Sequence, residues 1–227
     1  MNIQTLYSAL LRKFGPQGWW PLTTQAGKQG YDERGYHPSL YTPHQEEHRL
    51  EISIGAILTQ NTSWTNVEKA ILNLKKEKLL NRQALQKIPE EKLAQLIRSA
   101  GYFNQKARKL KTFISFNKPL NRENLLSIWG IGKETADSIL CYAYQQPTFV
   151  VDAYTQRIFQ RMGYQEQGYD AIQQKVMQEL STAQEYNEFH ALLVELAKRH
   201  CTKTKPTCSS CPLTKSCKKL IEASQSS

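Results

Sequence analysis

Four cysteines lie close together near the end of the 227-residue chain: Cys201, Cys208, Cys211 and Cys217. Four thiolates in so short a stretch can surround one metal centre, and both zinc and iron–sulfur clusters accept four cysteine ligands. Zinc ribbons usually contain two close Cys-x-x-Cys pairs, whereas here only Cys208 and Cys211 are so spaced, which favours an iron–sulfur cluster. The fifth cysteine, Cys141, lies on the apolar face of a helical run and is predicted to be a core residue.

A single carboxylate, Asp152, follows the apolar run 149–151 and opens a helical stretch. Aspartate commonly accepts the first N–H bonds of a helix, so capping is one interpretation. Beside a sugar, the same carboxylate could stabilise an oxocarbenium-like centre or activate water. The residues alone leave both roles open.

Two glycines, Gly130 and Gly132, separate an apolar helical run at 124–128 from a second run that carries Ala136 and Ile139. Glycine allows positive φ and close approach by another backbone, so the pattern predicts helix, tight hairpin, helix. The unpaired N–H groups at the start of the second helix could bind one phosphate of a DNA strand. The alternative is a turn that binds nothing.

Aromatic and amide side chains form a third group: Trp19, Trp20, Trp64 and Gln60. Enzymes that act on a nucleobase take it out of the base stack, so they need a flat surface to receive the base and a side chain to fill the gap. Each tryptophan could instead be a core residue.

The elements that would position these residues are helical. Apolar periodicity predicts helices over 2–14, 50–58, 66–80, 81–100 with a break at Pro89, 105–116, 152–162, 169–182 and 185–200, besides the two of the hairpin. Residues 148–151 are β-like but have no partner run, and the polar segment 27–47 is assigned no regular structure. We therefore expect an all-α fold.

The composition of the chain limits the kinds of partner that it is expected to bind. Thirty Lys and Arg against twenty Asp and Glu give a net charge of +10, which favours nucleic acid or an anionic surface. No apolar run is long enough to span a bilayer, and the N-terminus lacks the pattern of an export signal. We expect a cytoplasmic, nucleoid-associated monomer whose cysteines are reduced ligands.

In their order and distances, the hairpin, Asp152 and the cysteine loop resemble the helix-hairpin-helix DNA glycosylases of the endonuclease III superfamily. The resemblance implies a six-helix barrel over 47–146, a second helical domain from 1–30 and 147–227 that carries a 4Fe-4S cluster loop, and a connecting loop at 31–46. It makes Asp152 the essential carboxylate and Gln60 the residue that fills the gap left by a flipped base. By the same likeness, Gly130, Gly132, Lys133 and Thr135 would bind the backbone of damaged double-stranded DNA.

One departure bears on the reaction. Bifunctional members of that superfamily carry a lysine two residues after the second hairpin glycine, where this chain has Glu134. Lys133 is one residue early, and neighbouring helical residues point about 100° apart. The chain therefore resembles a monofunctional enzyme, in which water assisted by Asp152 displaces the base and leaves an abasic site.

Several segments are most similar to the 3-methyladenine DNA glycosylase III branch: 130–137, 141–143, 102–107 and Trp19-Trp20-Pro21. That resemblance implies that Trp20 and Trp64 sandwich an extruded alkylated purine. Ring methylation leaves such a base cationic, which strengthens stacking on aromatic faces and weakens the glycosidic bond. Two alternatives remain: a glycosylase/lyase for oxidised pyrimidines, and a non-catalytic DNA-binding module.

Overall fold

The structure is a computed structural model that describes residues 1–38, 40 and 45–221. The chain forms two compact units: Trp19–Gln146, and the two chain ends together, Met1–Gly18 with Pro147–Ser227. The boundaries of the two units lie between Gly18 and Trp19 and between Gln146 and Pro147. Trp20 and Leu22 are buried within the unit Trp19–Gln146.

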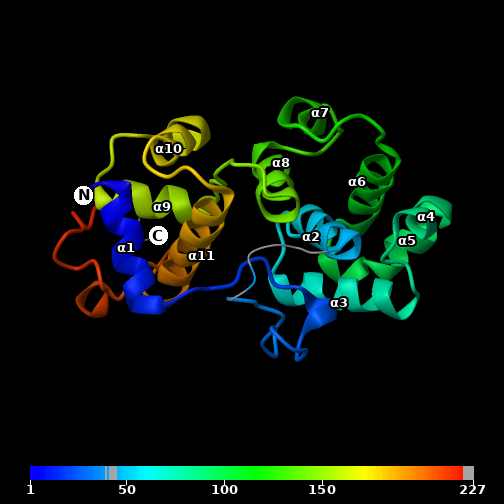
Figure 1. Cartoon of the computed structure of the whole chain (residues 1–227), viewed down its shortest axis with the longest axis horizontal. Helices are drawn as coiled ribbons and strands as arrows, with labels where there is room; N and C mark the ends of the chain where they lie inside the picture. The colour runs from blue at the N-terminus through cyan, green and yellow to red at the C-terminus, as the bar shows by residue number, and fades with distance from the viewer. Residues whose placement is uncertain (39, 41–44, 222–227) are drawn as a thin grey trace, which may run out of the picture. The chain divides into compact units, whose positions relative to one another are not determined.

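Helices account for all the regular structure in the described residues, which contain no strand, so the predicted all-α class is confirmed. None of these helices is long and apolar enough to cross a membrane. The unit Trp19–Gln146 contains α2 (Glu46–Leu58), α3 (Trp64–Lys76), α4 (Arg82–Lys87), α5 (Glu90–Leu96), α6 (Phe103–Ser115), α7 (Arg122–Leu126) and α8 (Lys133–Ser138), as labelled in Figure 1.

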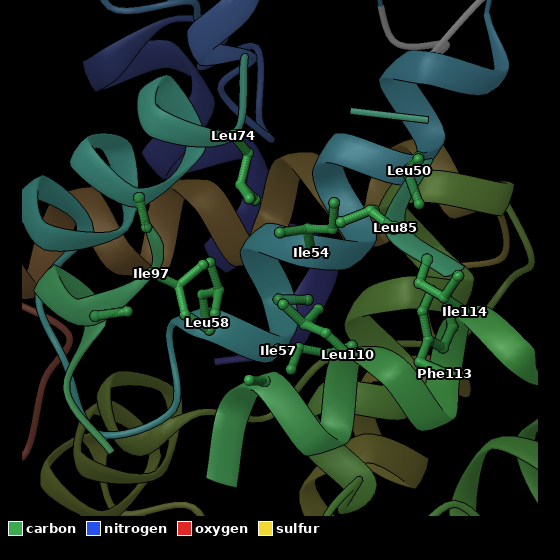
Figure 2. Close-up of a cluster of buried hydrophobic side chains, with 14 of the residues drawn as sticks. Leu50, Ile54, Ile57, Leu58, Leu74, Leu85, Ile97, Leu110, Phe113 and Ile114 are labelled. Atoms are coloured by element: carbon green, nitrogen blue, oxygen red, sulfur yellow. The ribbon is translucent and has the colours of Figure 1, made fainter. Parts of the chain in front are cut away.

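Helix α2 is the centre of this unit. It contacts α3, α6 and α8, and the side chains of Ile54, Ile57 and Leu58 are fully buried. Figure 2 shows these side chains in one buried cluster with Leu110 and Leu85 from other helices. A helix that is apolar on several faces must be surrounded, as the sequence indicates.

Helix ends differ from the predicted ones where the backbone leaves the helical region. α3 ends at Lys76 rather than at 80, because Lys78 has a left-handed φ of 58°. The predicted break at Pro89 is confirmed: it separates α4 from α5, since proline lacks the N–H that would continue the ladder. After α8 the chain passes directly into a π-helical turn, Ile139–Ala143.

The second unit contains α1 (Ile3–Phe14), α9 (Ala153–Met162), α10 (Gly168–Met177) and α11 (Ala183–Arg199). α11 packs against both α1 and α9 (Figure 1). Its Phe189 stacks on Phe149, with 5.7 Å between ring centroids, and both are fully buried. This core holds the extended run 149–151 in place directly before Asp152.

Candidate functional site

Asp152 is the N-cap of α9. Its Oδ1 accepts hydrogen bonds from the backbone N–H of Thr155 at 2.8 Å and from the Thr155 hydroxyl at 2.9 Å. The capping interpretation is therefore confirmed. The other oxygen, Oδ2, takes no part in the cap and lies 3.9 Å from Nε2 of His190. One carboxylate thus has one anchored oxygen and a second oxygen that the helix does not use.

The hairpin, residues 128–136, has two glycines with different requirements. Gly130 has φ 78°, and a Cβ there would lie 2.3 Å from Cε of Lys109. A Cβ built on Gly132, the N-cap residue of α8, would lie more than 4 Å from every described atom other than those of its chain neighbours. Gly130 is therefore needed by the fold itself, whereas the open space at Gly132 is available to something outside the chain.

Gln60 lies directly on the hairpin. Its Nε2 donates to the Gly130 carbonyl at 3.1 Å and to the Thr135 hydroxyl at 2.8 Å. Its Oε1 accepts from Nζ of Lys109 at 2.5 Å. Both ends of this amide are therefore engaged, and burial lowers the pKa of the Lys109 amine that holds one of them.

The other two residues predicted to bind the DNA backbone differ in exposure. Lys133 is exposed, as is its neighbour Glu134. Thr135 is 6% exposed, and its hydroxyl accepts from Gln60. The Thr135 side chain therefore faces the protein, which leaves its backbone N–H in the first turn of α8 as the group that could meet a phosphate.

Trp19, Trp20 and Trp64 gather in one place together with Tyr142 of the π-helical turn; we call these four residues the aromatic cluster. Trp20 and Trp64 meet edge to face, 5.2 Å apart at 82°, whereas Trp20 and Tyr142 lie 5.5 Å apart at 32°. The predicted sandwich needs two parallel faces, so the structure differs from it. Edge-to-face contact is the favoured arrangement of two aromatic quadrupoles when nothing lies between them.

The segment after the tryptophans folds back on them. The Leu22 N–H donates to the Gly35 carbonyl at 2.9 Å, and a Cβ on Gly35 would lie 2.2 Å from the Leu22 oxygen. Buried His37 contacts the Trp20 carbonyl through Nε2 at 2.9 Å. The described part of the polar loop is thus built from turns that support Trp20, while residues 39 and 41–44 lie outside the described residues.

The basic sequence of helix α6 suggests side chains that face solvent or a partner, but some of its lysines contact the protein itself. Lys106 is buried, and its Nζ donates to the carbonyls of Leu58 and Ala100 at 2.8 and 2.7 Å. Burial lowers the pKa of Lys106 to about 8, with the neighbouring Lys109 charge as a smaller cause. The amine therefore caps the end of α2, from which Gln60 follows, rather than facing a partner.

The four cysteines of the loop, Cys201, Cys208, Cys211 and Cys217, line one small cavity that is partly open to solvent. Buried Arg161 lies beside it, with Nη1 3.4 Å from the Cys201 sulfur. The Lys219 N–H donates to the Cys217 sulfur at 3.3 Å. Among the described residues, no three His, Cys, Asp or Glu side chains are grouped closely enough to hold a metal ion.

Sequence reasoning missed four residues. Tyr142 had no individual role assigned, and His190 and Arg161 are helical residues far along the chain from Asp152 and from the cysteines, respectively. A buried histidine or arginine is uncommon without a partner, but burial could not be read from sequence. The fourth omission, Tyr102, is 67% exposed with φ 44°, a strained conformation for an aromatic residue.

Comparison with known proteins decides the family. Residues 54–182, more than half of the chain, match the HhH-GPD superfamily of base excision DNA repair proteins. The chain belongs to this superfamily. MJ1434 of Methanocaldococcus jannaschii, assigned as a DNA repair glycosylase, is 41% identical over 95% of both chains. The predicted DNA glycosylase of base excision repair is thereby confirmed.

Two solved HhH-GPD structures are similar in fold. The H. pylori 3-methyladenine DNA glycosylase bound to 1,N6-ethenoadenine superimposes with a TM-score of 0.69 and 29% identity, over 88% of this chain and 98% of that one. A non-covalent endonuclease III–DNA complex gives a TM-score of 0.72 at 21% identity, covering 96% of both chains. The second likeness shows the endonuclease III fold alone, and relatives with this fold bind DNA.

Proposed function

We propose that this HhH-GPD glycosylase is monofunctional: it flips alkylated purines such as 3-methyladenine out of double-stranded DNA and releases them by hydrolysis, leaving an abasic site. The observation that carries the hydrolytic part is Glu134, exposed in the first turn of α8 at the position where bifunctional members carry lysine. A carboxylate cannot form a Schiff base with the sugar. Water is then the remaining acceptor of the glycosyl group.

Asp152 supplies the chemistry in this proposal. Thr155 fixes Oδ1, which leaves Oδ2 to stabilise the oxocarbenium-like sugar or to take a proton from the attacking water. An alkylated purine leaves as a cationic base that becomes neutral when the bond breaks. One carboxylate is then sufficient, because the leaving group needs no proton from the enzyme.

The aromatic cluster supplies the base pocket. Trp20 is buried and backed by Gly55 of α2, where a Cβ would come within 3.1 Å of Nε1 of the indole. Trp64 is only partly buried at the start of α3. We expect Trp64 to turn away from its edge-to-face contact when a base enters, while Trp20 stays. A cationic purine would gain cation–π energy from these faces.

Duplex DNA would be held at the hairpin. The Gly132 space and the first N–H groups of α8 form an anion site to which exposed Lys133 adds charge. Gln60 would fill the gap left by the flipped base, after giving up its bonds to Gly130 and Thr135. The hairpin is thus a phosphate contact and a resting place for the gap-filling amide.

The cysteine loop would hold a 4Fe-4S cluster. Its four thiols line one cavity, Arg161 brings a buried positive charge to it, and the Lys219 N–H already points at a sulfur. These are the features that favour thiolate ligands. Base hydrolysis transfers no electrons, so we assign the cluster a structural role in presenting the lysines of the loop to phosphate. Purified protein should be brown with broad visible absorption; colourless, zinc-containing protein contradicts this assignment.

One observation favours a lyase alternative: the Lys109 amine lies beside the hairpin, and burial lowers its pKa. The deciding experiment incubates the protein with methylated genomic DNA, identifies the free bases released, and repeats the reaction with borohydride. We expect free 3-methyladenine and no covalent product. A trapped complex that disappears in Lys109→Arg would establish the lyase, and release of oxidised pyrimidines alone would overturn the substrate.

Replacement of Glu134 provides the positive control for that experiment. In Glu134→Lys an amine occupies the position of the lyase lysine, and we expect borohydride to trap a covalent complex that the wild type does not give. Glu134→Gln removes the same charge without adding an amine and should behave as the wild type. Trapping in Glu134→Lys but not in Glu134→Gln would show that the assay detects a covalent complex whenever an amine is in place.

A further inference from the structure

The extended run before Asp152 has an unusual support. Phe149 and Val150 are extended but pair with no strand in the described part of the chain, so their buried carbonyls need other partners. Nε2 of Gln173, on α10, donates to the Phe149 carbonyl at 2.6 Å. Nδ1 of His190, on α11, lies 3.1 Å from the Val150 carbonyl. Side chains from two helices therefore hold successive carbonyls of the segment that delivers Asp152.

The Val150 contact determines which ring nitrogen carries the proton. A carbonyl oxygen only accepts hydrogen bonds, so Nδ1 of His190 must be the donor. The other ring nitrogen, Nε2, lies 3.9 Å from Oδ2 of Asp152, and this atom carries no hydrogen only when the ring is the neutral Nδ1–H tautomer. The ring is 4% exposed, and an edge contact with Phe149, 6.3 Å between centroids, holds it in this orientation.

We propose that His190 is a positioning residue for Asp152. It ties down the segment before the carboxylate while withholding a hydrogen-bond donor from Oδ2. A donor at that position would share the lone pairs that the proposed reaction uses, and it would weaken the carboxylate as a base. This inference rests on the proposed hydrolytic role of Asp152.

Three substitutions separate the two halves of the proposal. His190→Asn keeps an N–H near the position of Nδ1, His190→Gln places its amide near Nε2, and His190→Leu has neither. For single-turnover release of 3-methyladenine we expect Asn within about 3-fold of the wild type, and both Gln and Leu at least about 10-fold slower, the scale of one lost or misplaced hydrogen bond. DNA affinity should be unchanged in all three.

Two controls exclude a merely structural effect. Thermal melting should show the three variants folded, and Asn should be faster than Leu even where their stabilities match. In an Asp152→Asn background, His190→Leu should cause no further slowing, because the residue through which it acts is gone. Equal rates for Leu and wild type, slowing of Asn to the rate of Leu, or an equal effect without Asp152 would each overturn the proposal.

Nitrogen-15 NMR of the full-length protein tests the geometry without any substrate. We expect His190, assigned from the signals lost in His190→Asn, to be the Nδ1–H tautomer. The Nε2–H tautomer, or a ring protonated on both nitrogens, would overturn the inference even if base release is as proposed. Conversely, a wild type that releases no alkylated purine but shows the Nδ1–H tautomer would contradict the proposed function and leave the support of Asp152 standing.

Discussion

Gln60 and Asp152 are the two polar side chains to which we assign direct roles at the flipped nucleotide, and the structure holds them in opposite ways. Gln60 is bound at both ends of its amide, to Gly130 and Thr135 on one side and to Lys109 on the other. Asp152 is bound through one oxygen only. The carboxylate is therefore ready for its role, whereas the amide must first break contacts.

This difference fits the two roles that we assign, catalysis for Asp152 and gap filling for Gln60. A catalytic group loses rate if it must reorganise during the reaction, so pre-organisation favours a fixed carboxylate. A gap-filling group is needed only after a base has left the stack, and one that is stored on the hairpin stays out of undamaged duplex. The free energy of the bonds between Gln60 and the hairpin then has to be offset before the amide can fill the gap left by a flipped base.

The most severe test of the comparison is Asp152→Asn. Asparagine caps helices as well as aspartate does, so Thr155 should stay bound and the melting temperature should change little. Base release should fall by about 10²–10⁴-fold, the usual contribution of a catalytic acid or base. Single-turnover assays on methylated duplex measure the rate. Unchanged release would leave Asp152 as a cap only.

Lys106→Met tests how the start of the Gln60 segment is held. Two buried carbonyls, of Leu58 and Ala100, lose their donor, and we expect the free energy of unfolding to fall by about 2–3 kcal/mol. Denaturant titration at neutral pH measures this loss. Lys106→Arg, which keeps the charge in a larger group, tests whether the two short bonds matter.

The pKa of Lys106 also predicts how the loss of stability in Lys106→Met depends on pH. Lys106 has a pKa of about 8 in the folded protein, below the ordinary value of 10.5. Between these values the unfolded chain binds the proton and the folded chain does not, so raising the pH stabilises the folded state. The stability of the wild type minus that of Lys106→Met should therefore grow from pH 8 to 10.5. A flat or falling difference would contradict the assignment.

The two hairpin glycines should respond differently to alanine. Gly132→Ala meets no atom of the protein, so stability should be kept while affinity for duplex DNA falls about 10-fold, because the methyl group enters the proposed phosphate site. Gly130→Ala should lower stability as well, since φ 78° costs about 1–2 kcal/mol and Lys109 must move. Equal affinity in Gly132→Ala and wild type would remove the backbone contact from the proposal.

The smallest effects come from releasing Gln60. Thr135→Val keeps the side-chain shape but removes one acceptor, so affinity for DNA with an abasic-site analogue should rise about 2-fold or more, a fraction of one hydrogen bond. Gln60→Ala removes the gap-filling group and should lower the same affinity by a similar factor. Fluorescence anisotropy measures both. If both variants changed the affinity in the same direction, the bonds that hold Gln60 on the hairpin would not compete with gap filling.

The periodicity of apolar residues, together with helix-breaking proline and glycine, predicted most of the fold. The buried α2, the Pro89 break and the helix-hairpin-helix pattern all follow from residue spacing, because local packing and glycine chemistry decide them. The burial of Trp20 and Leu22 could not be predicted, because it depends on contacts with Gly35 and His37 in a turn-rich segment without periodicity. Such loops are fixed by particular hydrogen bonds, which spacing does not reveal.

The candidate site could be predicted only in part. Asp152, the two glycines and the four cysteines are marked by residue type and spacing, so the sequence predicts them as candidates. The perpendicular contact of Trp20 with Trp64 and the placement of His190 behind Asp152 depend on side-chain orientation. Orientation follows from packing between segments far apart in the chain, which one sequence does not specify.

The packing of α1 on α11 also constrains the order in which the molecule forms. Helix α1 packs on α11, which begins at Ala183, so these two helices of one unit lie at opposite ends of the chain. The unit Trp19–Gln146, in contrast, is one continuous stretch of sequence. During synthesis the unit with the hairpin and the tryptophans can fold as soon as it emerges, and the unit with Asp152 must wait for nearly the whole chain. An unfinished chain would thus acquire the hairpin to which we assign DNA contacts before it folds the unit that holds Asp152, the carboxylate to which we assign catalysis.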